Sequence, residues 1–288
     1  MKKVLFTSIL SSTVLLTACG SDDANGDADS NDQETPTEEN ATEKNESDTN
    51  GENSMTGEDV LNEAIALYDD VTSLYVVREG ALDQNISMPD DEDAGDAEIE
   101  MNITETQLQV IQDDDFYQRN ENSITSIVNE EGQDPEEQNM GTTISFTDAE
   151  DPNYQISYDE GDTEAIRYEG PDTGDFSFSE YAYPYEQMLE SGEVEFLGEE
   201  EINGFQTYHI SVEEDGEVTE LWFDTETFFE IQSTLNSESE SQDGEFQTEG
   251  GGVNTVVEYE LNIEPDLSQF QAPDDIEVVD GSMEDTIG

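Results

Sequence analysis

The sequence has few basic residues, and it has one cysteine, one histidine and one tryptophan among its 288 residues. Only 6 lysines and arginines oppose 77 aspartates and glutamates, which gives a formal net charge of −71. A charge of this size repels phosphate groups, so nucleic acids and anionic lipid headgroups are disfavoured as partners on electrostatic grounds. One histidine cannot form a zinc site of a common type. The sequence also contains no phosphate-binding loop and no Gly-x-Ser-x-Gly nucleophile motif.

The residues that remain do not form a recognisable catalytic set. His209 is expected in the middle of a strand, where packing is its ordinary role, and a Ser-His-Asp or Cys-His site would have to be assembled around it. Carboxylate runs at residues 90–93 and 113–115 offer the oxygen ligands that calcium prefers, but such runs arise by chance among 77 carboxylates. We therefore predict no catalytic residue, no metal site and no cofactor. A carboxylate pair for hydrolysis stays an alternative, since no pair can be singled out.

The N-terminus has the pattern of an export signal. Two lysines precede an apolar run over residues 4–16. A membrane span takes about 20 apolar residues, so this run is typical of a secretory signal peptide. The four residues Leu-Thr-Ala-Cys that end at Cys19 resemble the bacterial lipobox. The resemblance implies transfer of a diacylglyceryl group, with acyl chains such as palmitate, to the Cys19 sulfur, cleavage between Ala18 and Cys19, and anchoring at the extracytoplasmic face of the cell membrane. A chance cysteine after an ordinary signal, or a buried structural thiol, is the alternative.

Composition divides the chain into three predicted parts. Residues 1–18 are the signal peptide, residues 19–55 the lipidated cysteine with a linker, and residues 56–288 the folded domain. The linker consists almost entirely of small and polar residues, so it cannot bury a core and is expected to be disordered. About 35 residues of random coil span roughly 30 to 35 Å. The linker would therefore hold the domain away from the bilayer.

The predicted domain itself carries most of the charge. Residues 20–55 hold 12 of the 77 acids, and the other 65 lie in residues 56–288. Repulsion among these carboxylates destabilises the compact state in dilute buffer, whereas at about 1 M salt the Debye length falls to roughly 3 Å. This composition predicts a halophilic host. The alternative is an unusually acidic protein from an ordinary habitat.

The pattern of apolar residues predicts a mainly β (α+β) domain that opens with a helix. Thr56 can cap that helix together with Asp59, and apolar positions continue the helical stripe to residue 71. A second helical segment is expected over residues 179–189, confined or kinked by Pro184. Residues 236–252 read as a polar loop. A period of two predicts short strands at residues 74–82, 98–104, 108–111, 116–119, 124–128, 142–146, 154–158, 165–168, 228–235 and 253–263.

The clearest local unit is a hairpin over residues 207–224. Its centre, Asp215-Gly216, suits a two-residue type I′ turn, which fixes the register of both strands. The expected pairs are Tyr208 with Phe223, Ile210 with Leu221, Val212 with Thr219, His209 with Trp222, and Ser211 with Glu220. The first three pairs form an apolar face. The other two form a mixed face that meets water or a covering segment.

Three segments carry a resemblance to a known family. They are Gly-Phe-Gln-Thr-Tyr-His-Ile at residues 204–210, Leu-Trp-Phe-Asp at 221–224 with a turn to Phe228, and Phe-Gln-Ala-Pro-Asp at 270–274. With the opening helix and the antiparallel meander, they resemble the LolA/LppX/RseB-like superfamily of lipoprotein carriers and envelope lipoproteins. The resemblance implies an antiparallel half-barrel whose concave apolar side is covered by helices and can hold acyl chains. The anchor at Cys19 departs from free periplasmic carriers and favours a membrane-tethered relative.

Eight apolar or aromatic positions are the candidates for lining a ligand cavity. They are Tyr208, Ile210, Leu221, Phe223, Phe229, Ile231, Tyr259 and Leu261. Periodicity does not separate a filled core from a cavity, so both interpretations stay open. We expect a non-catalytic, monomeric lipoprotein that binds a lipid, an acylated protein or another hydrophobic ligand. The alternatives are an envelope sensor or protein-interaction module of the same fold without a cavity, and an extracellular carboxylate-dependent hydrolase.

Overall fold

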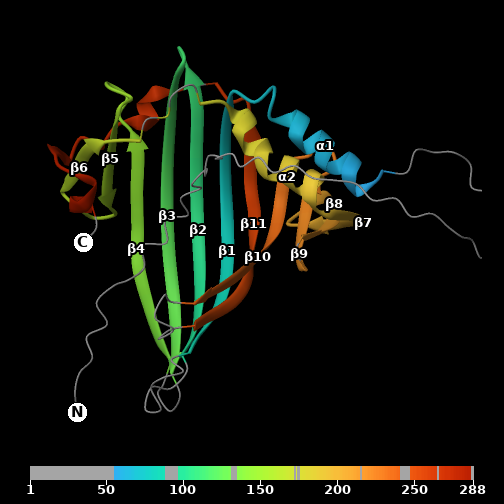
Figure 1. Cartoon of the computed structure of the whole chain (residues 1–288). Helices are drawn as coiled ribbons and strands as arrows, with labels where there is room; N and C mark the ends of the chain where they lie inside the picture. Colours follow the sequence, from blue (N-terminus) through green and yellow to red (C-terminus); the bar gives the residue numbers. More distant parts are fainter. Residues whose placement is uncertain are drawn as a thin grey trace, which may run out of the picture. The chain divides into compact units, whose positions relative to one another are not determined.

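The computed structural model (Figure 1) describes residues 55–87, 97–130, 135–171, 173, 176–214, 216–240, 247–264 and 266–286. Cys19, the signal peptide, the linker up to residue 54, the carboxylate run at 90–93 and Asp215 lie outside these ranges. None of the helices in the described ranges is long and apolar enough to span a membrane.

Within these ranges, twelve strands form one sheet in the order β12-β6-β5-β4-β3-β2-β1-β11-β10-β9-β8-β7. Neighbouring strands are antiparallel, except that β12 and β6 are parallel. Two meanders, β1 to β6 and β7 to β11, are joined by the pairing of β1 with β11. The predicted mainly β half-barrel with covering helices is confirmed. The strands are β1 (Ser73–Ser87), β2 (Ala97–Gln112), β3 (Asp115–Glu130), β4 (Glu136–Thr147), β5 (Tyr154–Asp159), β6 (Glu164–Glu169), β7 (Glu193–Ile202), β8 (Phe205–Glu214), β9 (Glu217–Asp224), β10 (Glu230–Glu240), β11 (Gln247–Leu261) and β12 (Glu277–Asp280).

Both predicted helical segments are present. Helix α1 (Gly57–Leu67) begins with the predicted capping box, in which the Asp59 backbone N–H donates to Thr56 Oγ1 at 3.1 Å. The second segment consists of the 3-10 helix η1 (Phe178–Ala182) followed by α2 (Tyr183–Ser191). The proline expected to confine this segment lies in the first turn of α2, where a backbone N–H has no intrahelical partner to lose.

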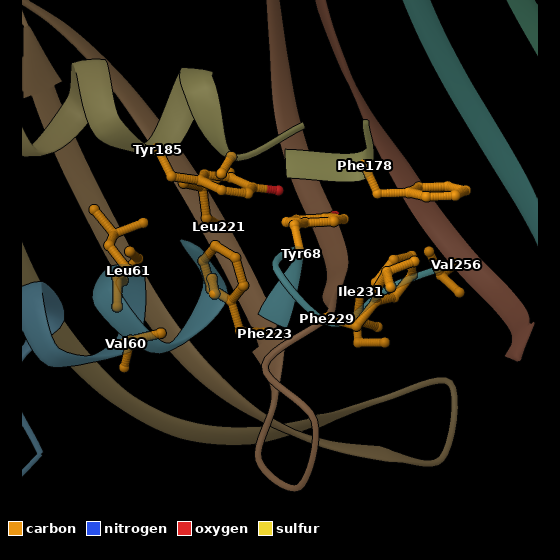
Figure 2. Close-up of a cluster of buried hydrophobic side chains, with 14 of the residues drawn as sticks. Val60, Leu61, Tyr68, Phe178, Tyr185, Leu221, Phe223, Phe229, Ile231 and Val256 are labelled. Carbon is orange, nitrogen blue, oxygen red and sulfur yellow. The ribbon is translucent and has the colours of Figure 1, made fainter. Parts of the chain in front are cut away.

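The sheet has two faces, and each has its own core. On β1, Leu74 and Val76 are buried on the side of α1, η1 and α2, whereas Tyr75 between them belongs to a cluster on the opposite side. We call these sides the helix face and the outer face. In the helix-face cluster, Leu61 from α1 and Tyr185 from α2 lie beside Leu221 and Phe223 of β9 (Figure 2).

The outer face is covered by the C-terminal part of the chain. Phe270, in the short 3-10 helix η2 (Leu267–Phe270), is fully buried, and its ring centroid lies 5.7 Å from that of Tyr117 on β3. Arg119 of β3 donates through Nη1 to the carbonyl of Gln269 at 3.0 Å. Beyond η2, the chain adds β12 to the edge of the sheet, followed by η3 (Met283–Thr286). The strand β12 was not predicted.

Several strands are longer than predicted. The expected strands at 98–104 and 108–111 form the single strand β2, and those at 116–119 and 124–128 form β3, because the polar residues between them keep alternating and stay paired. The predicted loop at 236–252 is also wrong at both ends, since β10 continues to Glu240 and β11 begins at Gln247. A Cβ on Gly252 would lie 2.0 Å from the Ala81 carbonyl oxygen. The glycine run therefore reflects close strand packing.

A bulge changes the predicted face of β11. Sequence alternation placed Val257 with Tyr259 and Leu261 on one face. The register shifts where Val77 opposes Glu258, so Val257 is 40% exposed and Val256, at 2% exposure, joins the helix face instead. Tyr259 and Leu261 keep their predicted side.

Candidate functional site

All eight predicted lining residues lie in one cluster on the helix face. The hairpin that carries four of them has the predicted register, with Tyr208 opposite Phe223 and Ile210 opposite Leu221. Gly216 has a φ of 91°, the left-handed conformation that such a turn requires. The exposed fractions are 0% for Ile210, Phe223 and Ile231, 1% for Phe229 and 2% for Leu221, and the other three are half-buried.

Helices α1 and α2 cover this cluster on the helix face of the sheet. Val60, Leu61 and Ala64 of α1 are all 0% exposed. The ring of Tyr185 from α2 meets that of Phe223 edge-on at 5.5 Å, as Figure 2 shows. A cavity large enough for water would leave accessible area on its walls. The five most buried residues have almost none, so the space around them is filled.

Two phenol hydroxyls join η1 and α2 to the sheet. Tyr185 donates to Glu230 Oε2 at 2.8 Å, and Gln109 Nε2 donates to the Tyr181 hydroxyl at 2.5 Å. Burial raises the pKa of Tyr185 well above its ordinary value, and it raises the pKa of Tyr181 as well. Both phenols therefore stay neutral at physiological pH. The helical cover is held by hydrogen bonds as well as by apolar contact.

The single histidine and the single tryptophan form a separate cluster on the outer face. His209 and Trp222 stack with centroids 4.2 Å apart, and Glu200 Oε1 lies 3.0 Å from His209 Nδ1 and 2.5 Å from Trp222 Nε1. Glu220 lies 3.5 Å from His209 Nε2. Sequence reasoning found the pairing of His209 with Trp222 but missed Glu200, because β7 was not predicted. Among the described residues, no group of three or more histidines and carboxylates is placed to hold a metal ion.

A cleft of about 640 Å³ lies between the β7–β8 turn and strands β1, β2, β10 and β11. Its walls include Glu79, Asn102, Glu201, Asn203 and Gln232. Asn203 is the first residue of a two-residue turn, has a φ of 51°, and donates to the Val256 carbonyl at 3.3 Å. This cleft is predominantly polar, and it is separate from the eight predicted lining residues.

No protein-family model and no curated protein matches the sequence. Solved structures similar to this chain include MucB of Pseudomonas aeruginosa in complex with MucA, with a TM-score of 0.35 and 13% identity over 77% of this chain and 63% of that chain. A putative outer membrane lipoprotein-sorting protein domain from Vibrio parahaemolyticus has a TM-score of 0.22 and 10% identity over 74% of this chain and 95% of the other. A LolA superfamily protein from Nitrosomonas europaea has a TM-score of 0.21 and 11% identity over 76% of this chain and 99% of the other. This chain spans less than two thirds of MucB, and its fold class rests on its own strand order.

Proposed function

We propose that this chain is a non-catalytic, extracytoplasmic lipoprotein that binds a partner protein. The observation that carries the proposal is the filled core on the helix face. Ile210, Phe223 and Ile231 have 0% exposure beneath α1 and α2, so an acyl chain would find no space among them. The partner protein therefore binds the surface of the domain, and the filled interior stabilises the fold.

The lipid anchor at Cys19 is part of the same proposal. The lipobox-like sequence supports it, and an acidic linker would let the domain reach a partner away from the bilayer. Protein from host membranes should partition into detergent, and its N-terminal peptide should carry diacylglycerol. The Cys19→Ala variant should be recovered from the medium. Recovery of unmodified wild-type protein in the aqueous phase would contradict the anchor.

Partner binding is tested by crosslinking on intact cells in molar salt. The expected result is a discrete crosslinked species that contains this chain and one other protein. The Phe223→Asp variant, in which the core is disrupted, should lose it. If wild-type protein crosslinks to nothing and carries an acyl compound instead, the carrier function is correct.

Binding of a hydrophobic ligand is the second candidate. One observation favours it: Tyr208, Tyr259 and Leu261 are only half-buried beside the packed residues. Movement of η1 and α2, which two phenol hydrogen bonds hold to the sheet, would widen this side of the cluster. Hydrolysis gains no comparable support, because carboxylates such as Glu79 and Glu201 are expected in any cleft of so acidic a chain.

A further inference from the structure

The polar cleft lies on the outer face of the sheet, beside the β7–β8 turn. Its floor consists of two rows of side chains that the strand register places next to one another across β10, β11, β1 and β2. One row is Gln232, Thr255, Glu79 and Thr104, and the other is Val253, Ala81 and Asn102. On β1 these are alternate positions that continue from Tyr75, which belongs to the outer-face cluster. The floor is therefore a continuous part of the outer face.

The wall of the cleft is the β7–β8 turn, which a hydrogen bond ties to the floor strands. Asn203 donates through Nδ2 to the Val256 carbonyl of β11 at 3.3 Å. Glu201, at the end of β7, accepts from Gln206 Nε2 through Oε2 at 3.0 Å, which leaves Oε1 for another donor. The volume of about 640 Å³ lies in the range of roughly 300 to 1,000 Å³ that ligand sites occupy. The cleft is open to solvent and large enough for a side chain of another molecule.

Most of the polar groups in the cleft are hydrogen-bond acceptors, and two of them are charged. Glu79 and Glu201 are exposed carboxylates, and neither forms an ion pair with a described residue. Thr255 donates its hydroxyl hydrogen to Gln232 Oε1 at 2.9 Å, so the hydroxyl oxygen can only accept. The donor of Asn203 is also in use, and its Oδ1 remains. A ligand that matches these groups therefore brings hydrogen-bond donors and positive charge.

Apolar side chains lie directly beside the carboxylates. Val253 is 36% exposed, and Ala81, its neighbour across the β1–β11 pair, is exposed as well. Long cationic side chains bury their methylene stems on apolar surface while the charged group stays among polar partners. Arginine adds five diverging donors on that group. Carboxylates alone would signify little in so acidic a chain, whereas carboxylates next to an apolar floor match both parts of an arginine side chain.

The described part of the chain has no arginine that could fill the cleft. Each arginine has a carboxylate partner elsewhere: Arg78 with Glu105 at 3.9 Å, Arg119 with Glu121 at 2.7 Å, and Arg167 with Asp148 at 2.7 Å. The other basic residue after Cys19 is Lys44, which precedes the described ranges. A guanidinium group in the cleft would therefore come from another molecule.

We propose that this cleft binds an arginine side chain of the partner protein. The guanidinium group pairs with Glu79 and Glu201, Asn203 Oδ1 accepts a further hydrogen bond, and the methylene stem packs on Val253 and Ala81. The formal charge of −71 attracts a basic partner surface over a distance. The cleft is the place where that attraction becomes a specific contact. The proposal rests on the partner-binding function above and names its chemistry.

A nuclear magnetic resonance titration with N-acetyl-Ala-Arg-Ala-amide tests the cleft directly. The chain is secreted from an ordinary cleavable signal in place of residues 1–19 and is studied in molar salt. The control peptide carries citrulline, which has nearly the same shape as arginine without its charge. The arginine peptide should shift the methyl signals of Val253 and bind about five-fold more tightly, the upper end for an exposed ion pair. Equal affinity of the two peptides, or shifts confined to other parts of the domain, would overturn the site.

Three kinds of variant separate the cleft from the general charge of the chain. Glu79→Gln and Glu201→Gln should each remove most of the difference between the peptides. Glu213→Gln on β8 makes the same change of charge at an exposed position outside the cleft and should retain the difference. If Glu213→Gln also removes it, net charge alone attracts the peptide and the inference is wrong. Lys44→Gln should leave the affinity unchanged. A several-fold gain would mean that the chain's own lysine occupies the cleft, which contradicts a site for a partner.

Crosslinking on intact cells, with a reagent that does not react with carboxylates, connects the cleft with the partner protein. The double variant Glu79→Gln, Glu201→Gln should lose the discrete crosslinked species, and Glu213→Gln should keep it. A species that persists in the double variant would refute this contact and leave the partner-binding function standing. Absence of any such species from the wild-type chain would refute the partner-binding function, and this inference with it.

Discussion

Phe223 is the residue on which the closed helix face depends most. It is fully buried, and Tyr185 covers its ring at 5.5 Å. Replacing it with alanine should lower the free energy of unfolding by about 3 to 5 kcal/mol, through lost burial and the cavity left behind. Val218→Ala on the same strand is the control, because Val218 is 47% exposed and its loss should change stability by about 0.5 kcal/mol or less. Urea unfolding in molar salt measures both. Equal effects would contradict a packed core.

Tyr259 makes the free energy of unfolding depend on pH in the alkaline range. Its ring stacks on Phe229 at 4.5 Å, and burial raises the pKa of its phenol from 10.0 to about 12. Because the pKa is higher in the folded state, folding favours the neutral phenol. Its contribution is complete below pH 10 and is lost as the pH rises towards about 12. Unfolding free energy should fall across this window, and less steeply in Tyr259→Phe. An unchanged slope in that variant would count against the assignment. Buried Tyr68 and Tyr185 produce the remaining fall.

Prediction from sequence worked where a local rule fixes the geometry. The Thr56 cap and the Gly216 turn specify a helix start and a hairpin register without reference to the rest of the chain, and both are confirmed. Glu200 beside His209 could not be found, because the contact depends on an unpredicted edge strand. The partners of Arg78 likewise depend on the pairing of β1 with β2, which joins residues 78 and 105.

At the scale of elements, the C-terminal segment depends on one arginine of β6. Arg167 Nε donates to Asp148 Oδ2 at 2.7 Å, its guanidinium lies 3.7 Å from the centroid of the Tyr154 ring, and Nη1 is 3.5 Å from Asp280 on β12. Asp148 is only 11% exposed, so Arg167→Met leaves a largely buried carboxylate unpaired. We expect a loss of about 3 kcal/mol.

Hydrogen exchange locates the effect of that substitution. Amides of β12, which pair with β6, should exchange faster in Arg167→Met. Asp280→Asn is the control: its side chain is 88% exposed, so it should alter stability by about 0.5 kcal/mol or less. Unchanged protection of β12 in Arg167→Met would mean that Phe270 and its apolar neighbours hold the segment without the arginine.

Elements that depend on distant pairing were the ones that sequence reasoning misjudged. β12 has four residues and gains its partner from β6, far back in the chain, so periodicity alone could not find it. The bulge at Val257 likewise arises from the pairing of β11 with β1. The long strands β2 and β3 were divided because their central residues are polar on both faces. Their continuity comes from paired neighbours on each side.

For the whole molecule, the formal charge of −71 sets the conditions of stability. Raising salt from about 0.1 M to about 1 M shortens the Debye length from roughly 10 to 3 Å. Several kcal/mol of relieved repulsion would raise the melting temperature by about 10 °C. Sucrose at matched osmolality separates screening from general solute exclusion and should have the smaller effect. A melting temperature that is the same in low and molar salt would contradict the predicted halophilic adaptation.

The most direct test of the filled helix face is native mass spectrometry of a secreted form of the chain, in which an ordinary cleavable signal replaces residues 1–19. This protein is purified gently from its host in molar salt. We expect the bare polypeptide mass, because Ile210, Phe223 and Ile231 leave no accessible space beneath the helices. A co-purifying acyl compound that is lost in a folded Ile210→Asp variant would contradict it. That result would assign the eight clustered residues to a ligand cavity that opens when the helical cover moves.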